Sequence, residues 1–139
     1  DEQLVKDAVA LAGSQSVVAS IDAKVVNGQY KCVICDGTKV IDMSPVELAK
    51  HAEELGVGEI FLNSIDRDGM MEGYDIDLVN QVVNAVDIPV TACGGAGGIS
   101  DLKDVIEKLK KELGDFVLEA DASISENNAM TFVDIDLTE

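Results

Sequence analysis

The clearest folding signal in the sequence is the stretch GEIFLNSIDRDGMMEGYD, residues 58–75. Its apolar part, residues 59–64, is typical of a buried strand, and the polar residues 65–74 predict a long loop. Apolar residues then recur at helical spacing across residues 75–86. A strand, a loop and a helix in this order are the repeating unit of α/β folds, so polar groups are expected at the carboxyl end of this strand.

The same alternation continues on both sides of this stretch. Strands that are joined through helices of about 10 to 15 residues pair in parallel, because antiparallel neighbours need only a short turn. We therefore predict an α/β fold with four parallel strands in a single domain, residues 1–139. The predicted strands are residues 16–21, 59–64, 89–93 and 115–120, and the predicted helices are residues 4–11, 46–55, 75–86 and 102–113.

Turn signals interrupt the connection after the first strand. An Asn27-Gly28 pair stands between alternating residues, and an Asp36-Gly37 pair follows it. Such pairs favour the left-handed backbone of a tight hairpin turn. The sequence therefore predicts a β-hairpin insertion at residues 24–43.

The strand ends resemble one another. The sequence Ser-Ile-Asp occurs at Ser20-Ile21-Asp22 and again, 44 residues later, at Ser64-Ile65-Asp66. Asp134-Ile135-Asp136 is a weaker repeat of it. This repetition is typical of a barrel built from duplicated units, whose chemistry gathers at the carboxyl ends of the strands.

The overall charge limits what the chain can bind. Ten Lys and Arg against 27 Asp and Glu give a net charge of −17, which repels nucleic acid and anionic membranes. A phosphorylated ligand is also repelled at long range, so an anion site has to be built locally from glycines and backbone N–H groups. A solvated acidic surface, as in a salt-adapted organism, is the alternative explanation of the charge.

The cysteines indicate a reducing compartment. Cys32, Cys35 and Cys93 are an odd number without a signal-peptide pattern, so we expect a cytoplasmic protein without a disulfide framework. Cys32 and Cys35 form a C-x-x-C pair, but two ligands do not make a structural zinc site. We expect no metal, no cofactor and, since no apolar run approaches about 20 residues, no membrane span.

Three groups of residues are candidates for chemistry. Asp22 follows an apolar strand and is a candidate general acid or base, although a strand-end aspartate that accepts loop N–H bonds is the alternative. The second group surrounds Asp68, where a solvated, capped loop is the alternative; the third is a glycine-rich turn before a helix, whose amides favour a phosphate. The second group comprises Asn63, Ser64, Asp66, Asp68 and Gly69, and the turn runs from Cys93 through Gly94, Gly95, Ala96 and Gly97 to Gly98.

Together these residues carry a family resemblance. The runs SVVASIDAK, GEIFLNSIDRDGMMEGYD and IPVTACGGAG resemble strands five, six and seven of the cyclase subunit of imidazole glycerol phosphate synthase. Their order and spacing match through Gly97. The resemblance implies the parallel (βα)4 half of a TIM barrel, with the hairpin insertion at residues 24–43 and a divergent C-terminal segment at residues 124–139.

The resemblance also implies roles for individual residues. Asp22 matches the second of the family's two catalytic aspartates. The first lies on strand one of the full-length family members, and nothing in this sequence clearly replaces it. The residues implied in substrate or phosphate binding are Asn63, Ser64, Asp68, Gly69, Gly94, Gly95 and Ser123, the last matching a serine after the eighth strand. Asn63 and Cys93 stand where histidine-pathway members more usually have small hydroxyl residues, and in this they resemble the branch thought to amidinate nucleotide-linked sugars.

The function that the resemblance implies is the formation of imidazole glycerol phosphate in histidine biosynthesis. The implied partners are a phosphorylated small-molecule substrate and a glutamine amidotransferase subunit that supplies ammonia. With one catalytic carboxylate, we expect the chain to be inactive or feeble alone. Two alternatives stay open: a non-catalytic or engineered half-barrel that completes a barrel as a homodimer, and a nucleotide-sugar amidination subunit.

Overall fold

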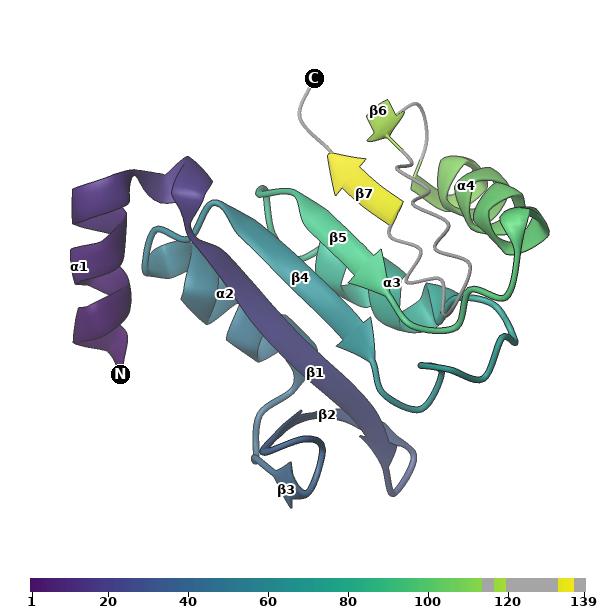
Figure 1. The fold of residues 1–139 in the computed structure, drawn as a ribbon, viewed down its shortest axis with the longest axis horizontal. Helices are drawn as coiled ribbons and strands as arrows, with labels where there is room; N and C mark the ends of the chain where they lie inside the picture. The colour runs from purple at the N-terminus through teal and green to yellow at the C-terminus, as the bar shows by residue number, and fades with distance from the viewer. Residues whose placement is uncertain (114–116, 120–132, 137–139) are drawn as a thin grey trace.

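The computed structural model describes residues 1–113, 117–119 and 133–136 and confirms a mixed α/β fold (Figure 1). Its helices are α1 (Glu2–Ala12), α2 (Pro45–Glu54), α3 (Ile76–Val83) and α4 (Ile99–Leu113), with a short 3-10 turn, η1 (Ser14–Ser16). Its strands are β1 (Val18–Val26), β2 (Gln29–Ile34), β3 (Lys39–Val40), β4 (Glu59–Ser64), β5 (Val90–Cys93), β6 (Val117–Glu119) and β7 (Val133–Asp136).

The described strands form one sheet in the order β3-β2-β1-β4-β5-β7-β6. Its centre is parallel: β1 pairs with β4, and β4 pairs with β5. Helices connect these strands, as expected for parallel neighbours that need a crossover. The predicted parallel core is therefore present, and it carries the carboxyl ends of three strands to one edge.

The prediction of four consecutive parallel strands is wrong at the β5 side of the sheet. β7 lies between β5 and β6 and is antiparallel to both, so β6, the predicted fourth strand, does not pair with β5. An antiparallel strand satisfies the edge N–H and C=O groups of β5 as well as a parallel one does. Local periodicity indicates a strand but not its neighbour, which is why the sequence did not reveal this order.

The first strand is longer than predicted. β1 continues past Asp22 to Val26 and turns at Asn27 and Gly28, whose φ angles are +51° and +78°, into the antiparallel β2. Two positive φ angles are those of the hairpin turn that an Asn-Gly pair favours. Asp22 consequently lies inside a strand, not at its end, because β2 pairs with β1 from Asp22 onward.

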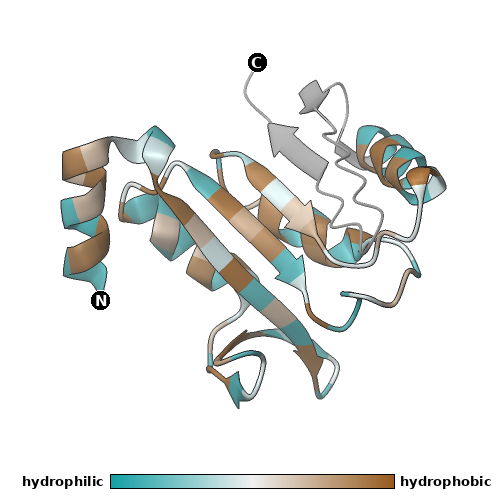
Figure 2. Ribbon diagram, in the orientation of Figure 1, coloured by the Kyte–Doolittle hydropathy of each residue, from teal (hydrophilic) through white to brown (hydrophobic). Residues whose placement is uncertain are grey.

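The two faces of the sheet differ. In Figure 1, α2 and α3 lie behind β1, β4 and β5, and none of the described helices crosses the front of these strands. The apolar core lies on the helix side, and Figure 2 shows brown, apolar bands along β1, β4 and β5. Its most deeply buried residues on β1, β4 and β5 are Ile21, Ala23, Ile60, Leu62, Val90 and Ala92. Because successive strand residues alternate in direction, Asp22, Asn63 and Cys93 project from the opposite face.

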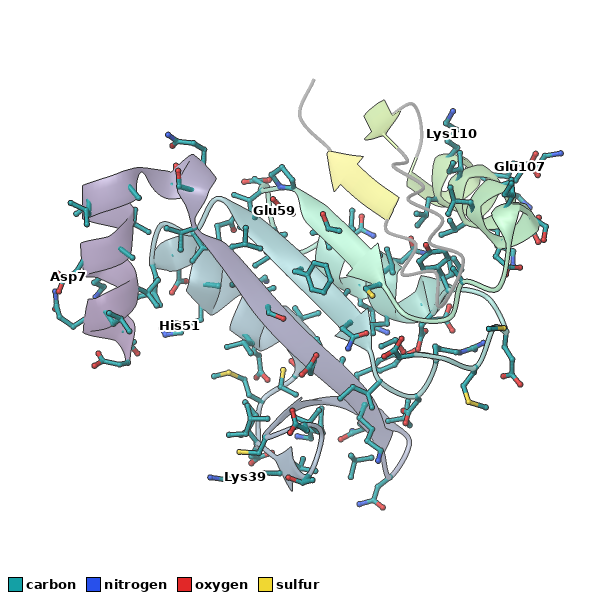
Figure 3. The ribbon with its side chains drawn as sticks, viewed as in Figure 1. Asp7, Lys39, His51, Glu59, Glu107 and Lys110 are labelled. Carbon is teal, nitrogen blue, oxygen red and sulfur yellow. The ribbon has the colours of Figure 1, made fainter. Side chains whose placement is uncertain are left out.

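Local chemistry explains how the helices begin. Ser44 and Glu47 form a capping box at α2, in which the Ser44 side chain accepts from the Glu47 amide and Glu47 accepts from the Ser44 amide. Nε2 of His51 on α2, labelled in Figure 3, lies 3.1 Å from Oε1 of Glu2 on α1. Helix α1 itself has no fully buried residue.

Among the described helices, none has the length and apolar character needed to cross a membrane.

Candidate functional site

Three side chains form a row across the face of the sheet that is opposite to α2 and α3. Asp22 on β1 is the register partner of Asn63 on β4, and Asn63 is the register partner of Cys93 on β5. Register partners in parallel strands project from the same face as close neighbours. The row lies near the carboxyl ends of β4 and β5, at the end of β4 opposite to Glu59, which Figure 3 labels.

Asn63 is hydrogen-bonded to the candidate catalytic carboxylate. Its Nδ2 donates to Oδ1 of Asp22 over 3.1 Å. This bond fixes the orientation of the amide, because a flipped amide would place its oxygen against a carboxylate oxygen. Oδ1 of Asn63 is consequently turned away from Asp22; it is buried and has no hydrogen-bond partner among the residues that the structure describes.

The pKa of Cys93 reflects the charges around this row of side chains. Burial raises the pKa of its thiol, and the negative charges of Asp68 and Asp22 raise it further, while the backbone N–H of Gly94 acts in the opposite direction. The thiol is therefore neutral at neutral pH. Since charge effects of this kind fall off with distance, both carboxylates lie in the neighbourhood of Cys93, although they come from different elements.

The glycine-rich turn directly follows this row. Gly94 and Gly95 have φ angles of +94° and +104°, which L side chains rarely adopt. A Cβ atom at Gly94 would lie 2.6 Å from the Ser64 carbonyl oxygen, and one at Gly95 would overlap the Gly73 carbonyl. Gly73 also donates its amide to the Gly95 carbonyl over 2.8 Å. The two glycines are thus required for close packing against the loop after β4.

An anionic side chain already occupies part of the turn. Oδ2 of Asp101 accepts from the amide of Gly97 at 2.7 Å and from the amide of Gly98 at 3.1 Å. These are the bonds that a negative group makes at the N-terminus of a helix, here α4. Two amides at the exposed end of the turn are therefore bound by a carboxylate of the chain itself.

The remaining predicted residues have different surroundings. Ser64 is buried, and its hydroxyl donates to Asp75 over 3.4 Å, so it does not share the face of Asn63. Asp68 is exposed in the loop after β4, where its amide donates to the Ser64 carbonyl. Gly69 has a φ angle of +73°, and a Cβ atom there would meet nothing within 4 Å, which leaves open space. Ser123 lies outside the described residues.

The resemblance between Ser20-Ile21-Asp22 and Ser64-Ile65-Asp66 does not reflect equivalent positions. Asp22 pairs with Asn63 in the sheet, whereas Asp66 lies in the turn beyond β4. Oδ2 of Asp66 accepts from the Val25 amide over 2.7 Å. Asp66 thus ties the loop after β4 to the hairpin, which is a structural role.

Sequence reasoning missed two residues that shape this region. The hydroxyl of Tyr30 on β2 donates to Oδ1 of Asp75 over 2.7 Å, and Asp75 also accepts from the Leu78 amide at the start of α3. Burial, together with the bond to Asp75, raises the pKa of Tyr30. The helix-starting position of Asp75 is recognisable in the sequence, but its distant partner is not.

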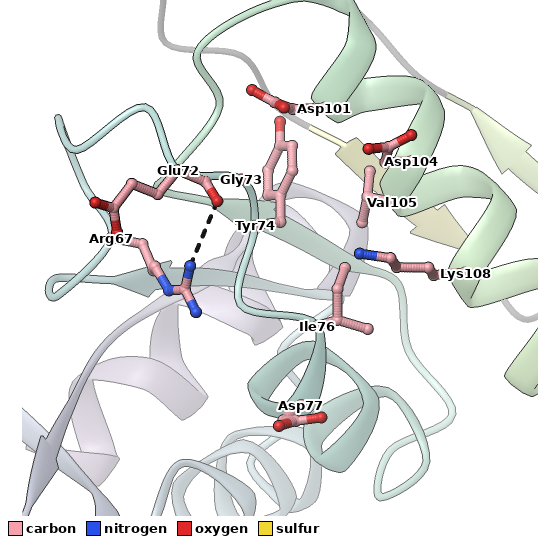
Figure 4. A pocket seen from close by; sticks show the side chains of 10 residues that line it. All are labelled: Arg67, Glu72, Gly73, Tyr74, Ile76, Asp77, Asp101, Asp104, Val105 and Lys108. Atoms are coloured by element: carbon pink, nitrogen blue, oxygen red, sulfur yellow. Dashed lines mark hydrogen bonds between the residues drawn. The ribbon is translucent and has the colours of Figure 1, made fainter.

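A cavity of about 260 Å³ lies beside the glycine turn, between the loop after β4 and α4 (Figure 4). Arg67 and Lys108 bring positive charge to it, but acidic side chains outnumber them, so this cavity is a poor anion site. Arg67 Nη1 donates to the Glu72 carbonyl over 3.5 Å, the dashed line in Figure 4. The acidic side chains are Glu72, Asp77, Asp101 and Asp104.

Comparison with known proteins identifies similar sequences. The family model described as histidine biosynthesis protein matches residues 1–122. The imidazole glycerol phosphate synthase subunit HisF of Saccharolobus solfataricus is 43% identical over 110 residues, which are 79% of this chain and 44% of that protein. The subunits of the same name from Petrotoga mobilis and from Lactococcus lactis subsp. cremoris are 42% identical over 106 residues and 46% identical over 102 residues.

These alignments cover most of this chain but a smaller part of each relative. The matched residues are 75% of this chain and 42% of the Petrotoga protein, and 72% of this chain and 39% of the Lactococcus protein. The chain thus spans about two fifths of the length of the curated relatives it matches. The resemblance predicted from the strand motifs is confirmed.

Proposed function

Because this chain belongs to the histidine biosynthesis protein family, we propose that it is the phosphate-binding half of a cyclase of the imidazole glycerol phosphate synthase type. In the proposed reaction, ammonia attacks a phosphorylated ribulosyl aminoimidazole carboxamide intermediate, the aminoimidazole carboxamide part leaves as a second product, and ring closure with loss of water gives imidazole glycerol phosphate. A glutamine amidotransferase subunit is the proposed source of the ammonia. The reducing interior of a cell is the proposed location.

The observation that carries this proposal is the arrangement of Asp22 and the glycine turn. Asp22 lies in the row with Asn63 and Cys93, and the turn begins at Gly94, the next residue after that row. A ligand with a phosphate at the turn therefore extends its reacting part toward Asp22. A carboxylate that lies in this position, within hydrogen-bond reach of the ligand, transfers a proton to or from it.

The phosphate end of the proposed site is built from local groups. The net charge of −17 opposes an anion at long range, so backbone amides and the start of α4 have to supply the attraction. The two amides that already bind Asp101 support this, since they hold a carboxylate in the geometry of an anion site. We propose that phosphate binds at Gly94 and Gly95, with Ser123 as a further ligand.

The substrate hydroxyls are proposed to bind at the loop after β4. Asp68 offers an exposed carboxylate there, and the open space at Gly69 lets a ligand approach the backbone. A carboxylate accepts hydrogen bonds from hydroxyl groups without changing its own charge. Asp68 thus has a positioning role in this proposal, separate from the proton transfer assigned to Asp22.

The proposed half-barrel is incomplete in its chemistry. It carries one catalytic carboxylate, and the face of β1, β4 and β5 opposite to α2 and α3 corresponds to the interior of a barrel that further strands would close. In this account the hairpin at residues 24–43, which comprises the end of β1 together with β2 and β3, is an insertion on the half-barrel. We propose that the chain alone is inactive or feeble and requires a second half that contributes the other aspartate.

Complementation tests this proposal. The N-terminal half of the Petrotoga mobilis HisF relative is added to the chain, with ammonium and the phosphorylated intermediate, and product formation is followed. Turnover should need both halves and should fall at least 100-fold with Asp22→Asn, because removal of a general acid or base costs about that much or more. A Lys39→Ala control, in the exposed strand β3, should not change the rate. Equal rates for the wild type and Asp22→Asn contradict the proposed role.

A second candidate is a self-associating half-barrel without turnover. Among the described strands, β2 pairs with β1 only from Asp22 to Val26. The residues of β1 before Asp22 therefore have one unpaired edge. Val18, on that edge, is 50% exposed. An unpaired edge with apolar side chains is a template for another strand. Light scattering tests this: a dimer that Val18→Lys dissociates supports it, and a monomer at high concentration excludes it.

A third candidate is the branch that amidinates nucleotide-linked sugars. It is favoured by Asn63 and Cys93, which are neighbours in the row. The histidine-pathway members that this chain resembles more usually carry small hydroxyl residues at these two positions. Incubation of the complemented chain with each class of substrate distinguishes the branches. Turnover of the nucleotide-linked sugar alone would favour this candidate over histidine biosynthesis.

A further inference from the structure

We propose that Asn63 recognises a cationic nitrogen group of the ligand, with its Oδ1 accepting one N–H while the Asp22 carboxylate accepts another. The inference deepens the proposed function and rests on it for the location of the ligand. It starts from a single atom, the buried Oδ1 of Asn63, which lacks a hydrogen-bond partner among the described residues.

A buried acceptor without a partner is costly. Leaving such a group unsatisfied costs about 1 to 3 kcal/mol, and native structures leave few of them. Exchanging the positions of Oδ1 and Nδ2 does not remove this cost, because the hydrogen bond from Nδ2 to Asp22 determines which way the amide points. An atom of this kind at a ligand site is explained if the ligand supplies the donor.

The surroundings of Oδ1 place it inside the proposed site. A Cβ atom at Gly94 would lie 3.2 Å from Oδ1, so any side chain at the first position of the turn would crowd this oxygen. On the other side of the amide lies the Asp22 carboxylate. Oδ1 therefore stands between the proposed phosphate end and the proposed proton-transfer residue.

The local charges select the kind of donor. Asp22 and Asp68 are both close enough to raise the pKa of Cys93, so negative charge surrounds the row. The Asn63 amide oxygen and the Asp22 carboxylate are neighbouring acceptors, which match a group carrying at least two N–H donors. An amidinium or an ammonium group meets both requirements, whereas a hydroxyl offers one donor and no positive charge.

A titration followed by NMR tests this directly. The ¹⁵N-labelled chain is titrated with acetamidine hydrochloride, and the side-chain amide signal of Asn63 is assigned by its loss in Asn63→Leu. Tetramethylammonium chloride is the matched probe, with the same charge and no N–H donor. We expect a saturable shift of the Asn63 and Asp22 signals with acetamidinium and none with tetramethylammonium.

Two variants complete the test. In Asn63→Leu, acetamidinium should bind about fivefold more weakly, the loss expected for one hydrogen bond. Asn63→Thr, whose hydroxyl can donate to Asp22 and still accept, should restore most of the affinity. Equal affinity in wild type and Asn63→Leu, or equal binding of the two probes, overturns the inference; so does the absence of a saturable shift in the wild type.

A parallel titration with inorganic phosphate separates this inference from the proposed function. If acetamidinium shifts Asn63 and phosphate does not shift the glycine turn, the role of Asn63 stands and the phosphate site falls. If phosphate binds the turn and Asn63→Leu leaves acetamidinium binding unchanged, the opposite holds. Each result therefore decides one of the two proposals.

Discussion

The hydroxyl of Tyr30 on β2 donates a hydrogen bond over 2.7 Å to Oδ1 of Asp75, which lies 45 residues further along the chain. The same carboxylate accepts from Ser64 and from the amide of Leu78. One side chain thus connects the hairpin, the end of β4 and the start of α3. These contacts hold the loop that carries Asp68, so the hairpin supports the rim of the candidate site.

Tyr30→Phe removes this connection with little change in shape. We expect the free energy of unfolding to fall by about 2 kcal/mol, as for the loss of a hydrogen bond to a charged group. Denaturant unfolding measures the change, and the double variant with Asp75→Asn should cost less than the sum of the two single changes. Additive effects would show that the two residues do not interact.

The glycines of the site should differ in their tolerance of a side chain. Gly95→Ala places a Cβ atom against the Gly73 carbonyl at a φ angle of +104°, so we expect a loss of several kcal/mol or failure to fold. Gly69→Ala meets open space and should cost only about 1 to 2 kcal/mol, from its φ angle of +73°. Thermal melts of the two variants compare them. A smaller loss for Gly95→Ala than for Gly69→Ala would contradict the packing described here.

Cys32 should make stability depend on alkaline pH. Burial raises the pKa of its thiol from 9.0 to about 11, and the charge of Glu47 adds to this. The folded chain therefore keeps the proton over a range where the unfolded chain loses it. The resulting stabilisation is complete below about pH 9 and is lost as pH rises through about 11, with a magnitude of roughly 2 kcal/mol.

Urea unfolding at intervals between pH 8 and pH 11 measures this dependence. The slope of stability against pH should decrease in Cys32→Ala, whatever the absolute stability of that variant. Cys35→Ala is the matched control, since Cys35 is exposed, and its slope should equal that of the wild type. An unchanged slope in Cys32→Ala would show that another group titrates.

Asp101 should compete with phosphate. Its carboxylate binds the amides of Gly97 and Gly98, at the exposed end of the turn. Asp101→Asn keeps an acceptor there but removes a negative charge, and a charge several ångströms away contributes about 1 kcal/mol. We expect inorganic phosphate to bind at least about threefold more tightly to the variant, as measured by calorimetry. Weaker binding would show that Asp101 assists the anion site.

Local features of the fold were predictable from the sequence because their causes are local. The hairpin turn follows from Asn27-Gly28, and the start of α2 follows from the Ser44 to Glu47 capping box. The parallel core follows from the alternation of strands and helices. These features depend on residues within a few positions of one another, which a single sequence displays.

Features that join distant parts of the chain were not predictable in the same way. Periodicity did not show that β7 would separate β6 from β5, nor that β1 would continue past Asp22. For the candidate site, motifs indicated Asp22 and the glycine turn, but the pairing of Asp22 with Asn63 depends on strand register. Ser64 was selected with its neighbours, although alternation along β4 turns it to the other face.

The central claim is that the turn after β5 binds phosphate beside Asp22, and an NMR titration of the ¹⁵N-labelled chain with inorganic phosphate tests it most directly. We predict saturable shifts of backbone amides within residues 94–98, smaller shifts at Asp22 and Asn63, and no comparable shift at Lys39 in β3. Saturable shifts that spare residues 94–98, or no saturable shift anywhere, would contradict the account.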